Sequence, residues 1–266
     1  MIQSIHMKQI LLGLLTAAIV TGCNSKDEKG KFTLQGDVKN VPNQQVYLEQ
    51  LFFTSQEAQV LDTANIENGH FEVSSTATED GLYRIRFEKT NSGFIFINDQ
   101  PKINFKADIN DASIAGPTFT SPANQALKNL LLNIEGQRVN LMATSRAVDS
   151  LKTVKASDSA IAATSLQLAN INGKFNQFIT KYIDTVSQPI VALFALGYTQ
   201  GMDPASLNTV VPNLVKRFPN HQGVIGVVTQ FNEMIAAQNQ PKPTNSNTPG
   251  VGSMAPDFSM NDTEGR

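Results

Sequence analysis

The hydrophobic residues of this 266-residue chain change their spacing once, near residue 120. Before that point they alternate with polar residues, as in Tyr83, Ile85 and Phe87. A period of two indicates β-strands with one buried face. After that point apolar residues recur every three or four positions, which indicates amphipathic helices. The sequence therefore predicts the α+β class, with an antiparallel, sandwich-like β-module at residues 31–120 and an α-helical region at residues 121–238.

Seven short segments of the β-module have strand character. Asn68-Gly69, Asp80-Gly81 and 98–101 carry turn residues between them. Asn-Gly is the pair that best adopts the positive φ angles of a type I′ turn, so it predicts a β-hairpin. We expect consecutive strands to be neighbours. The candidate strands are 32–39, 45–51, 58–64, 70–74, 83–88, 94–97 and 102–107.

Two sets of side chains in this module have alternative interpretations. Phe52-Phe53, together with Phe94 and Phe96, could line a ligand groove, although apolar residues at strand spacing are usually core residues. Arg84 and Arg86 lie on one face of a candidate strand and could bind an anionic ligand. A solvated strand face is the commoner arrangement for such a pair.

The helical region should begin with a long helical hairpin. Ser121-Pro122 predicts an N-cap and a first turn for a helix that reaches about Val148. A second helix follows the connection at 155–158, with apolar residues at heptad a and d positions. The two helices are expected to pack antiparallel, either on each other alone or with a seam offered to a protein partner or a second copy. The heptad residues are Ile161, Leu168, Ile171, Phe175, Phe178 and Tyr182.

Three shorter helices are predicted after the hairpin. Ser187 can cap the first, Asp203-Pro204 begins the second, and residues 221–237 form the third. Pro212 lies within the second helix and is expected to kink or end it.

The first residues resemble the leader of a bacterial lipoprotein. Lys8 precedes a mostly apolar run at 9–20, which as a helix would span about 18 Å, less than the roughly 30 Å hydrocarbon core. The run leads into Val20-Thr21-Gly22-Cys23, which resembles the lipobox. The resemblance implies cleavage after Gly22, a signal peptide at residues 1–22 and a lipid on Cys23.

An anchor of this kind would hold the mature chain in the cell envelope, at the outer membrane, on its periplasmic face or at the cell surface. Residues 23–30 are polar and would form a flexible tether. The alternative is a buried Cys23 behind an ordinary signal peptide.

Four segments of the β-module resemble a domain of unknown function that follows the lipid anchor of many bacterial envelope lipoproteins and precedes a thioredoxin-like domain. They are 32–36, 46–48, 62–71 and 81–83. The matching residues are mostly turn and core positions. The resemblance therefore implies a fold more than an activity.

The end of the chain resembles the start of another domain. Residues 239–252 are rich in Pro, Asn and Thr and read as a linker. Within 253–266, Ala255-Pro256-Asp257-Phe258 resembles the start of thioredoxin-like domains of the thiol:disulfide interchange and peroxiredoxin (AhpC/TSA) type. Such domains carry a Cys-x-x-Cys pair at a helix N-terminus. Fourteen residues cannot fold as a domain, so we expect a truncated front part of a longer protein; a polar tail that matches by chance is the alternative.

Composition and motifs exclude several functions. With 21 Lys+Arg against 23 Asp+Glu there is no basic surface for nucleic acid, and one cysteine allows no internal disulfide. Outside the leader, His70 and His221 lack metal-ligand spacing, and no phosphate-binding loop or serine nucleophile motif occurs. Glu79-Asp80 falls in a predicted loop, where solvated charge is the default. We assign no catalytic residues, no metal and no cofactor.

Two functions follow from these observations. The first is the N-terminal, non-catalytic region of a lipid-anchored, cell-envelope thiol:disulfide oxidoreductase, which positions or presents partners to a redox domain. The second is a stand-alone lipid-anchored binding or scaffold protein of the envelope.

Overall fold

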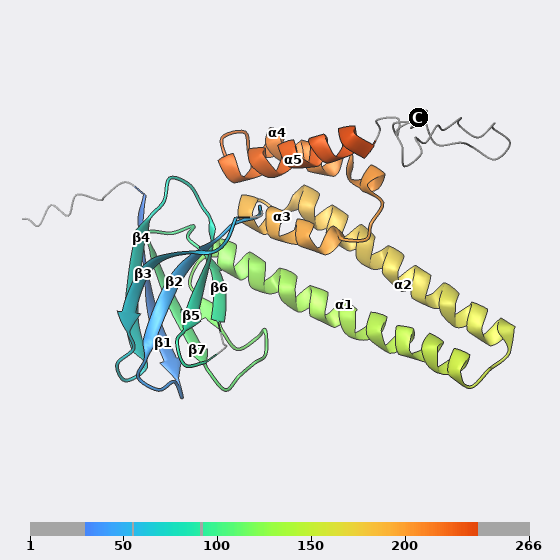
Figure 1. The fold of residues 1–266 in the computed structure, drawn as a ribbon, viewed down its shortest axis with the longest axis horizontal. Coiled ribbons are helices and arrows are strands. Elements are labelled where there is room, and N and C mark those ends of the chain that lie inside the picture. The colour runs from blue at the N-terminus through green and yellow to red at the C-terminus, as the bar shows by residue number, and fades with distance from the viewer. Residues whose placement is uncertain (1–29, 55, 91–92, 239–266) are drawn as a thin grey trace, which may run out of the picture.

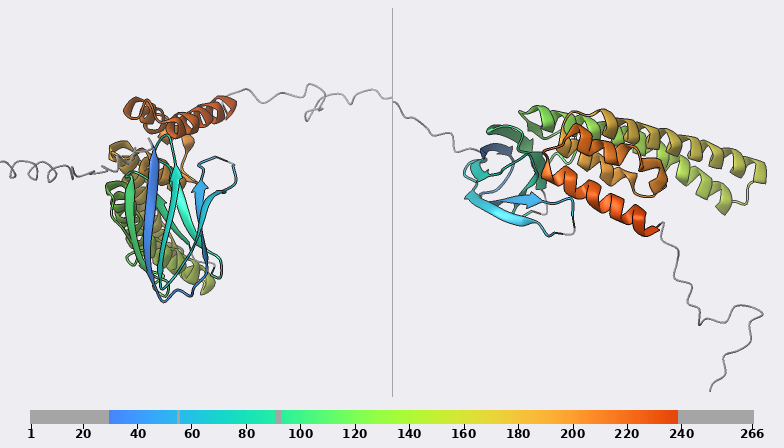
Figure 2. Two further views of the ribbon diagram at one scale, coloured as in Figure 1. Left: turned by 90° about the vertical axis from the view of Figure 1, so that its left-hand side faces the viewer. Right: turned by 90° about the horizontal axis from the view of Figure 1, so that it is seen from above.

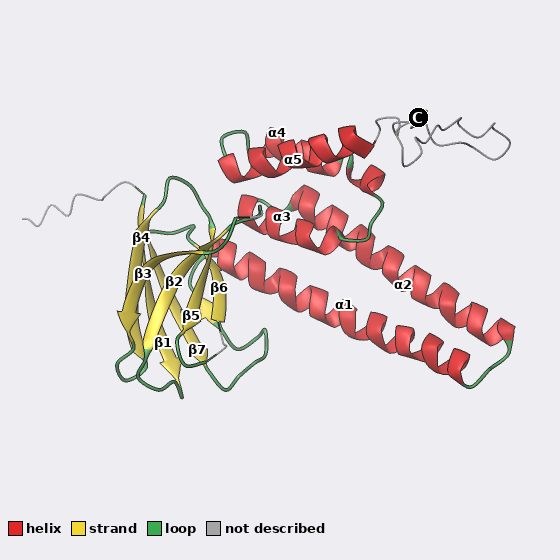
Figure 3. Ribbon diagram, in the orientation of Figure 1, coloured by secondary structure: helices red, strands yellow, loops and turns green. Residues whose placement is uncertain are grey.

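The computed structural model describes residues 30–54, 56–90 and 93–238. The predicted signal peptide, Cys23, the linker and the thioredoxin-like start lie outside these ranges. A β-sandwich forms one end of the described chain, and the helices extend from it (Figure 1, Figure 3). The predicted α+β class, a sandwich followed by helices, is confirmed.

The strands of the described chain form two four-stranded sheets. Sheet A has the order β4-β1-β7-β8 and sheet B the order β3-β2-β5-β6. Seven strands correspond to the predicted segments, whereas β8 was not predicted because two residues show no alternation. The strands are β1 Lys31–Lys39, β2 Gln45–Leu51, β3 Gln59–Asn65, β4 His70–Thr76, β5 Leu82–Phe87, β6 Gly93–Ile97, β7 Lys102–Asp108 and β8 Thr118–Phe119.

The inward residues of the two sheets form an aromatic-rich core, as the alternation predicts. Phe32 packs on Tyr83, with ring centroids 4.9 Å apart, and Phe119 stacks on Phe105 at 4.6 Å and on Phe96 at 5.8 Å. The contact between Phe119 and Phe96 joins β8, a short strand of sheet A, to β6, an edge strand of sheet B. Figure 2 shows the two layers seen along the sandwich.

The prediction that consecutive strands are neighbours is wrong for several connections. Asn68 and Gly69 do have positive φ angles of 52° and 84°, and Glu67 and His70 exchange backbone hydrogen bonds around them. The turn nevertheless joins β3 to β4, which belong to different sheets. Ile66, just before the turn, is fully buried, so the chain crosses the edge of the sandwich there instead of folding back on the same sheet.

Sheet A is also not purely antiparallel. β1 pairs antiparallel with β4 but parallel with β7. Parallel pairing requires a long connection, and here the chain passes through sheet B between the two strands. The module is therefore antiparallel-rich, with one parallel pair.

The helices are α1 Pro122–Thr153, α2 Asp158–Thr185, α3 Pro189–Leu196, α4 Val210–Arg217 and α5 Gln222–Gln238, with short 3-10 turns η1 Gly197–Thr199 and η2 Pro204–Leu207. The predicted cap is confirmed, because the Ser121 hydroxyl accepts a hydrogen bond from the Asn124 amide. The helix runs five residues past Val148, since no residue breaks it before the turn in which Lys155 has a φ of 52°.

Three details of the shorter helices differ from prediction. The N-cap of α3 is Gln188, not Ser187. Asp203-Pro204 starts only the 3-10 turn η2, and α4 begins separately at Val210. Pro212 neither kinks nor ends α4, because it lies in the first turn, where the missing N–H has no intrahelical partner to lose.

The predicted antiparallel hairpin of α1 and α2 is present and projects away from the sandwich (Figure 1). The heptad residues of α2 are only half-buried, and its fully buried residues are Ile179 and Ile183 near the base. The reason is that α3 and α4 pack only on the half of the hairpin that is nearer the sandwich. Towards the tip, Val139 and Leu166 keep 59% and 64% of their surface exposed.

Neither alternative for Arg84 and Arg86 describes their contacts, because both side chains pair with a carboxylate of the same sheet. Their Nε atoms donate to the Glu49 carboxylate at 2.7 and 2.6 Å, and Arg86 also lies 4.1 Å above the ring of Tyr47. Only 4% of Glu49 is exposed. Burial disfavours its charged form, but the hydrogen bonds and charges of both arginines outweigh this and lower the pKa of Glu49.

We expect Glu49→Gln to lower the free energy of unfolding near neutral pH by about 1–2 kcal/mol. A lowered folded-state pKa means that ionised Glu49 stabilises the fold above the ordinary carboxyl pKa, and that this contribution is lost as the pH falls through the lowered value. The difference between variant and parent should therefore shrink in acid. Urea unfolding across pH measures it, with exposed Glu57→Gln as the control. A difference that is constant with pH would contradict the assignment.

Candidate functional site

The most elaborate polar structure of the described chain lies where the helices meet the sandwich. Leu82 and Ile97, on the outer face of sheet B, belong to the same buried cluster as Leu130, Ile183 and Val191 of the helices. The sandwich and the helical array thus share one apolar core across their boundary. Two polar joints flank this core.

The first joint ties α1 to the edge strand β6. The Asn124 carboxamide accepts from the Ile97 N–H at 2.8 Å and donates to the Ile97 carbonyl at 2.7 Å. It also donates to the capping Ser121 hydroxyl at 2.6 Å. The Asp99 carboxylate accepts from the Ala123 N–H at 2.8 Å, where the positive end of the helix dipole favours an anion. Asn124 is only 4% exposed.

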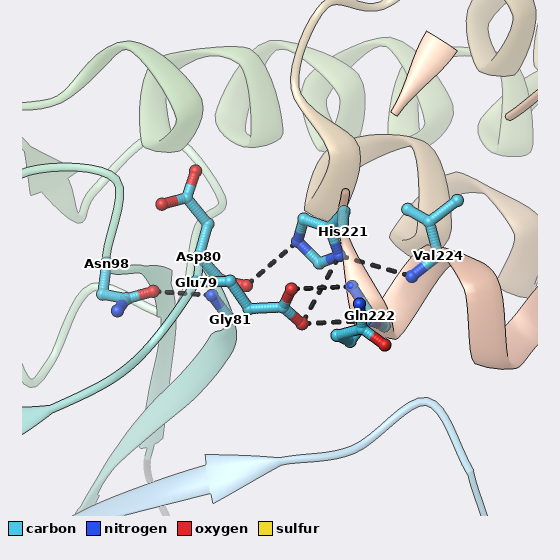
Figure 4. A network of polar contacts seen from close by, with 8 residues as sticks. Glu79, Asp80, Gly81, Asn98, His221, Gln222 and Val224 are labelled. Carbon is cyan, nitrogen blue, oxygen red and sulfur yellow. Dashed lines mark hydrogen bonds and ion pairs between the residues drawn. The ribbon is translucent and has the colours of Figure 1, made fainter. Parts of the chain in front are cut away.

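The second joint ties the loop between β4 and β5 to the start of α5 (Figure 4). The Glu79 carboxylate accepts from the backbone N–H groups of Gln222 and Gly223 at 2.7 and 3.0 Å. His221 Nδ1 lies 3.6 Å from Glu79 and accepts from the Val224 N–H at 3.3 Å, while its Nε2 lies 3.1 Å from the Asp80 carbonyl. These contacts define the tautomer in which Nε2 carries the proton.

The side chain of Asp80 points away from His221 in Figure 4. Burial raises its pKa, and the negative charges of Asp99 and Glu79 raise it further against the opposing effect of His221. Next to it, burial and the same acidic loop raise the pKa of Tyr83 to about 12. Groups with perturbed protonation equilibria mark candidate functional sites, but they also occur in structural networks.

The polar groups at these joints form hydrogen bonds that hold the helices to the sandwich. Glu79 and Asp99 cap helices, and the ring of His221 is bonded on both nitrogens. Within the described ranges, no group of three or more His, Cys, Asp or Glu residues could hold a metal ion. His70 lies elsewhere, 69% exposed, on the outer face of sheet A, 3.9 Å from Asp37.

Two clefts open beside the joints. One, of about 430 Å³, lies between Phe52-Phe53, the Glu79 loop and α5. The other, of about 400 Å³, lies between β6, the connection from β7 to β8, and α1. Phe94 lines the second cleft, whereas Phe96 is fully buried in the core. Phe52, Phe53 and Phe94 thus line grooves, and Phe96 belongs to the core.

The sequence pointed to only part of this site. Glu79 and Asp80 were expected to be solvated, because a loop carboxylate shows no sign of a helix that starts some 140 residues later. No motif in the sequence marks Asn124; its one signal is a polar residue among the apolar positions at the start of α1. Cys23 and Gly22, the predicted lipid and cleavage sites, lie outside the described residues.

Comparison with known proteins identifies one domain. A family described as a domain of unknown function (DUF4369) matches residues 32–142. The match covers the sandwich and ends within α1, and it is consistent with the prediction of an N-terminal domain of unknown function. No curated protein and no solved structure matches the chain. Among the described helices, none is both long and apolar enough to cross a membrane.

We expect Glu79→Ala to lower the free energy of unfolding by about 1–2 kcal/mol, because two N–H groups at the start of α5 lose their acceptor. Hydrogen exchange should speed up at the amides of Gln222 and Gly223. Glu233→Ala, an exposed site on the same helix, is the control. Unchanged exchange at both amides would show that Glu79 does not cap α5 in solution.

Proposed function

We propose that this chain is the N-terminal, non-catalytic region of a lipid-anchored thiol:disulfide oxidoreductase of the bacterial cell envelope. The observation that carries the proposal is the shared core between sandwich and helices, held on both sides by helix-capping joints. Such a boundary resists hinge motion, since a rotation would break the buried hydrogen bonds of Asn124 and the two hydrogen bonds that Glu79 accepts from the start of α5. The region acts as a rigid platform.

The geometry of the platform suits a spacer between a membrane and a following domain. The described chain starts at the sandwich, whereas α5 begins against the sandwich and ends at Gln238, away from it (Figure 1, Figure 2). In the proposed arrangement, a lipid on Cys23 tethers the sandwich side, and the redox domain follows the linker at 239–252. The platform would then position that domain or present partners to it.

The resemblance of Val20-Thr21-Gly22-Cys23 to a lipobox and of 255–258 to a thioredoxin-like start supports this assignment. Redox chemistry would belong to the following domain, which would carry its own Cys-x-x-Cys pair. The second candidate is a stand-alone lipid-anchored binding or scaffold protein of the envelope. The apolar cleft between β6 and α1 favours it, because such a cleft can hold a partner without any catalytic group.

The lipid anchor is tested by Cys23→Ala. We expect the variant to lose metabolic labelling with an alkyne-bearing palmitate analogue and to leave the membrane fraction, because Cys23 is the cysteine at the lipobox position, where the thioether-linked lipid is attached. Ser25→Ala should remain labelled. Labelling that persists in Cys23→Ala would contradict the anchor.

The redox assignment is tested by the intact mass of the product of the native locus, after removal of lipid, together with a count of reactive thiols. We expect a mass well above 28.9 kDa and two additional reactive thiols. A mass equal to that of residues 23–266, with no additional thiol, would contradict the oxidoreductase proposal and leave the anchored scaffold.

A further inference from the structure

The two open edges of the sandwich differ in the contacts that their backbone groups make. At the edge formed by β3 and β4, the Asp62 carboxylate accepts from the Ser74 N–H at 2.8 Å, and the Asn68-Gly69 turn joins the two strands. The Asp62 side chain thus accepts a hydrogen bond from a backbone N–H of β4 that points away from β1. The connection from β3 to β4 runs from one sheet to the other at this edge. The Ser74 N–H is therefore not free to pair with another strand.

The opposite edge, formed by β6 and β8, is only partly closed. Asn124 bonds both the N–H and the carbonyl of Ile97, so these groups point away from β5. In an antiparallel strand, residues two positions apart direct their backbone groups to the same side. The N–H and carbonyl groups of Ile95 and Gly93 therefore also face outward. Within the described chain, no hydrogen bond outside the β5–β6 ladder reaches them.

The outward groups of Ile95 and Gly93 face the second cleft. Its volume is about 400 Å³, and its walls come from β6, the loop before β8, and α1. Most of the residues that line the cleft are apolar. Its large apolar side chains are partly exposed, except for that of Leu127, which is buried. The residues that matter here are Phe94, Ile95, Ile114, Phe119, Leu127 and Leu131.

The charge of the cleft is balanced. Among the described residues that line it, one is acidic, Asp111, and one is basic, Lys128. The Lys128 ammonium donates to the carbonyls of Ala115 and Pro117 at 2.5 and 2.8 Å, which holds the loop before β8 against α1. The cleft thus suits an uncharged, apolar occupant that also needs backbone hydrogen-bond partners. An extended peptide meets both requirements.

We propose that the β6 edge and this cleft form a docking site for an extended, uncharged peptide segment of a partner protein. The peptide adds a strand beside β6, pairs with the backbone of Ile95 and Gly93, and places a large apolar side chain next to Phe94 and Phe119. The site continues the interface between α1 and the sandwich, where the Asn124 carboxamide already bonds β6 as a strand residue would. It depends neither on the lipid anchor nor on a redox domain.

The test uses the full chain, purified in a mild detergent, and a library of random seven-residue peptides. Ile95→Pro removes the outward N–H without touching the β5–β6 ladder, which uses the other side of the strand. Ile95→Ala is the matched control, because it removes the side chain but keeps the N–H. A second pair is Leu131→Glu, which puts a charge into the cleft, and Leu132→Glu, which lies next to it outside the lining.

We expect the selected peptides to alternate apolar residues and to bind about tenfold more weakly to Ile95→Pro than to Ile95→Ala. Leu131→Glu should weaken binding by at least the same factor, and Leu132→Glu should not. Hydrogen exchange at the Ile95 amide should slow when a peptide binds. Thermal unfolding of each variant shows that the fold is retained.

Three results would overturn the proposal. The first is that no peptide is enriched on the parent chain. The second is that the enriched peptides bind Ile95→Pro and Ile95→Ala equally, which would mean that the outward N–H is not used. The third is a dimer in light scattering that Ile95→Pro dissociates, which would assign the edge to a second copy of this chain.

Discussion

The two hydrogen bonds between the Asn124 carboxamide and the backbone of Ile97 fix the start of α1 against the edge strand β6. Both lie in the interior, with Asn124 only 4% exposed, so breaking them would leave buried polar groups without partners. They set where α1 leaves the sandwich. The direction of α1 in turn determines where α2 returns, and α3 and α4 pack on that base.

The second joint completes this arrangement from the far end of the chain. The helices after α2 return to the sandwich, and Glu79 captures the start of α5 with two hydrogen bonds. Two carboxylates near the boundary, Glu79 and Asp99, thus accept hydrogen bonds from backbone N–H groups at the starts of α5 and α1. The proposed platform role rests on these contacts at the boundary between the sandwich and the helices.

Local features of the fold followed from the sequence. The alternation predicted seven strands, Ser121-Pro122 predicted the start of α1, and the heptad pattern predicted the pairing of α1 with α2. Each depends on residues close to one another along the chain. The Asn68-Gly69 turn shows the limit of such reasoning. Its backbone angles were predictable, but the sheet that each flanking strand joins was not.

The candidate site shows the same division more sharply. The periodicities, the caps, and the resemblance of residues 20–23 and 255–258 to a lipobox and a thioredoxin-like start are properties of the sequence itself. Tertiary structure alone decided that Glu49 would lie buried between two arginines, that Glu79 would cap a distant helix, and that Ile95 would keep an open edge. The physical reason is the range of the interactions. Periodicity and capping act within a few residues, whereas these contacts join segments from 35 to more than 140 residues apart, or depend on which strand ends a sheet.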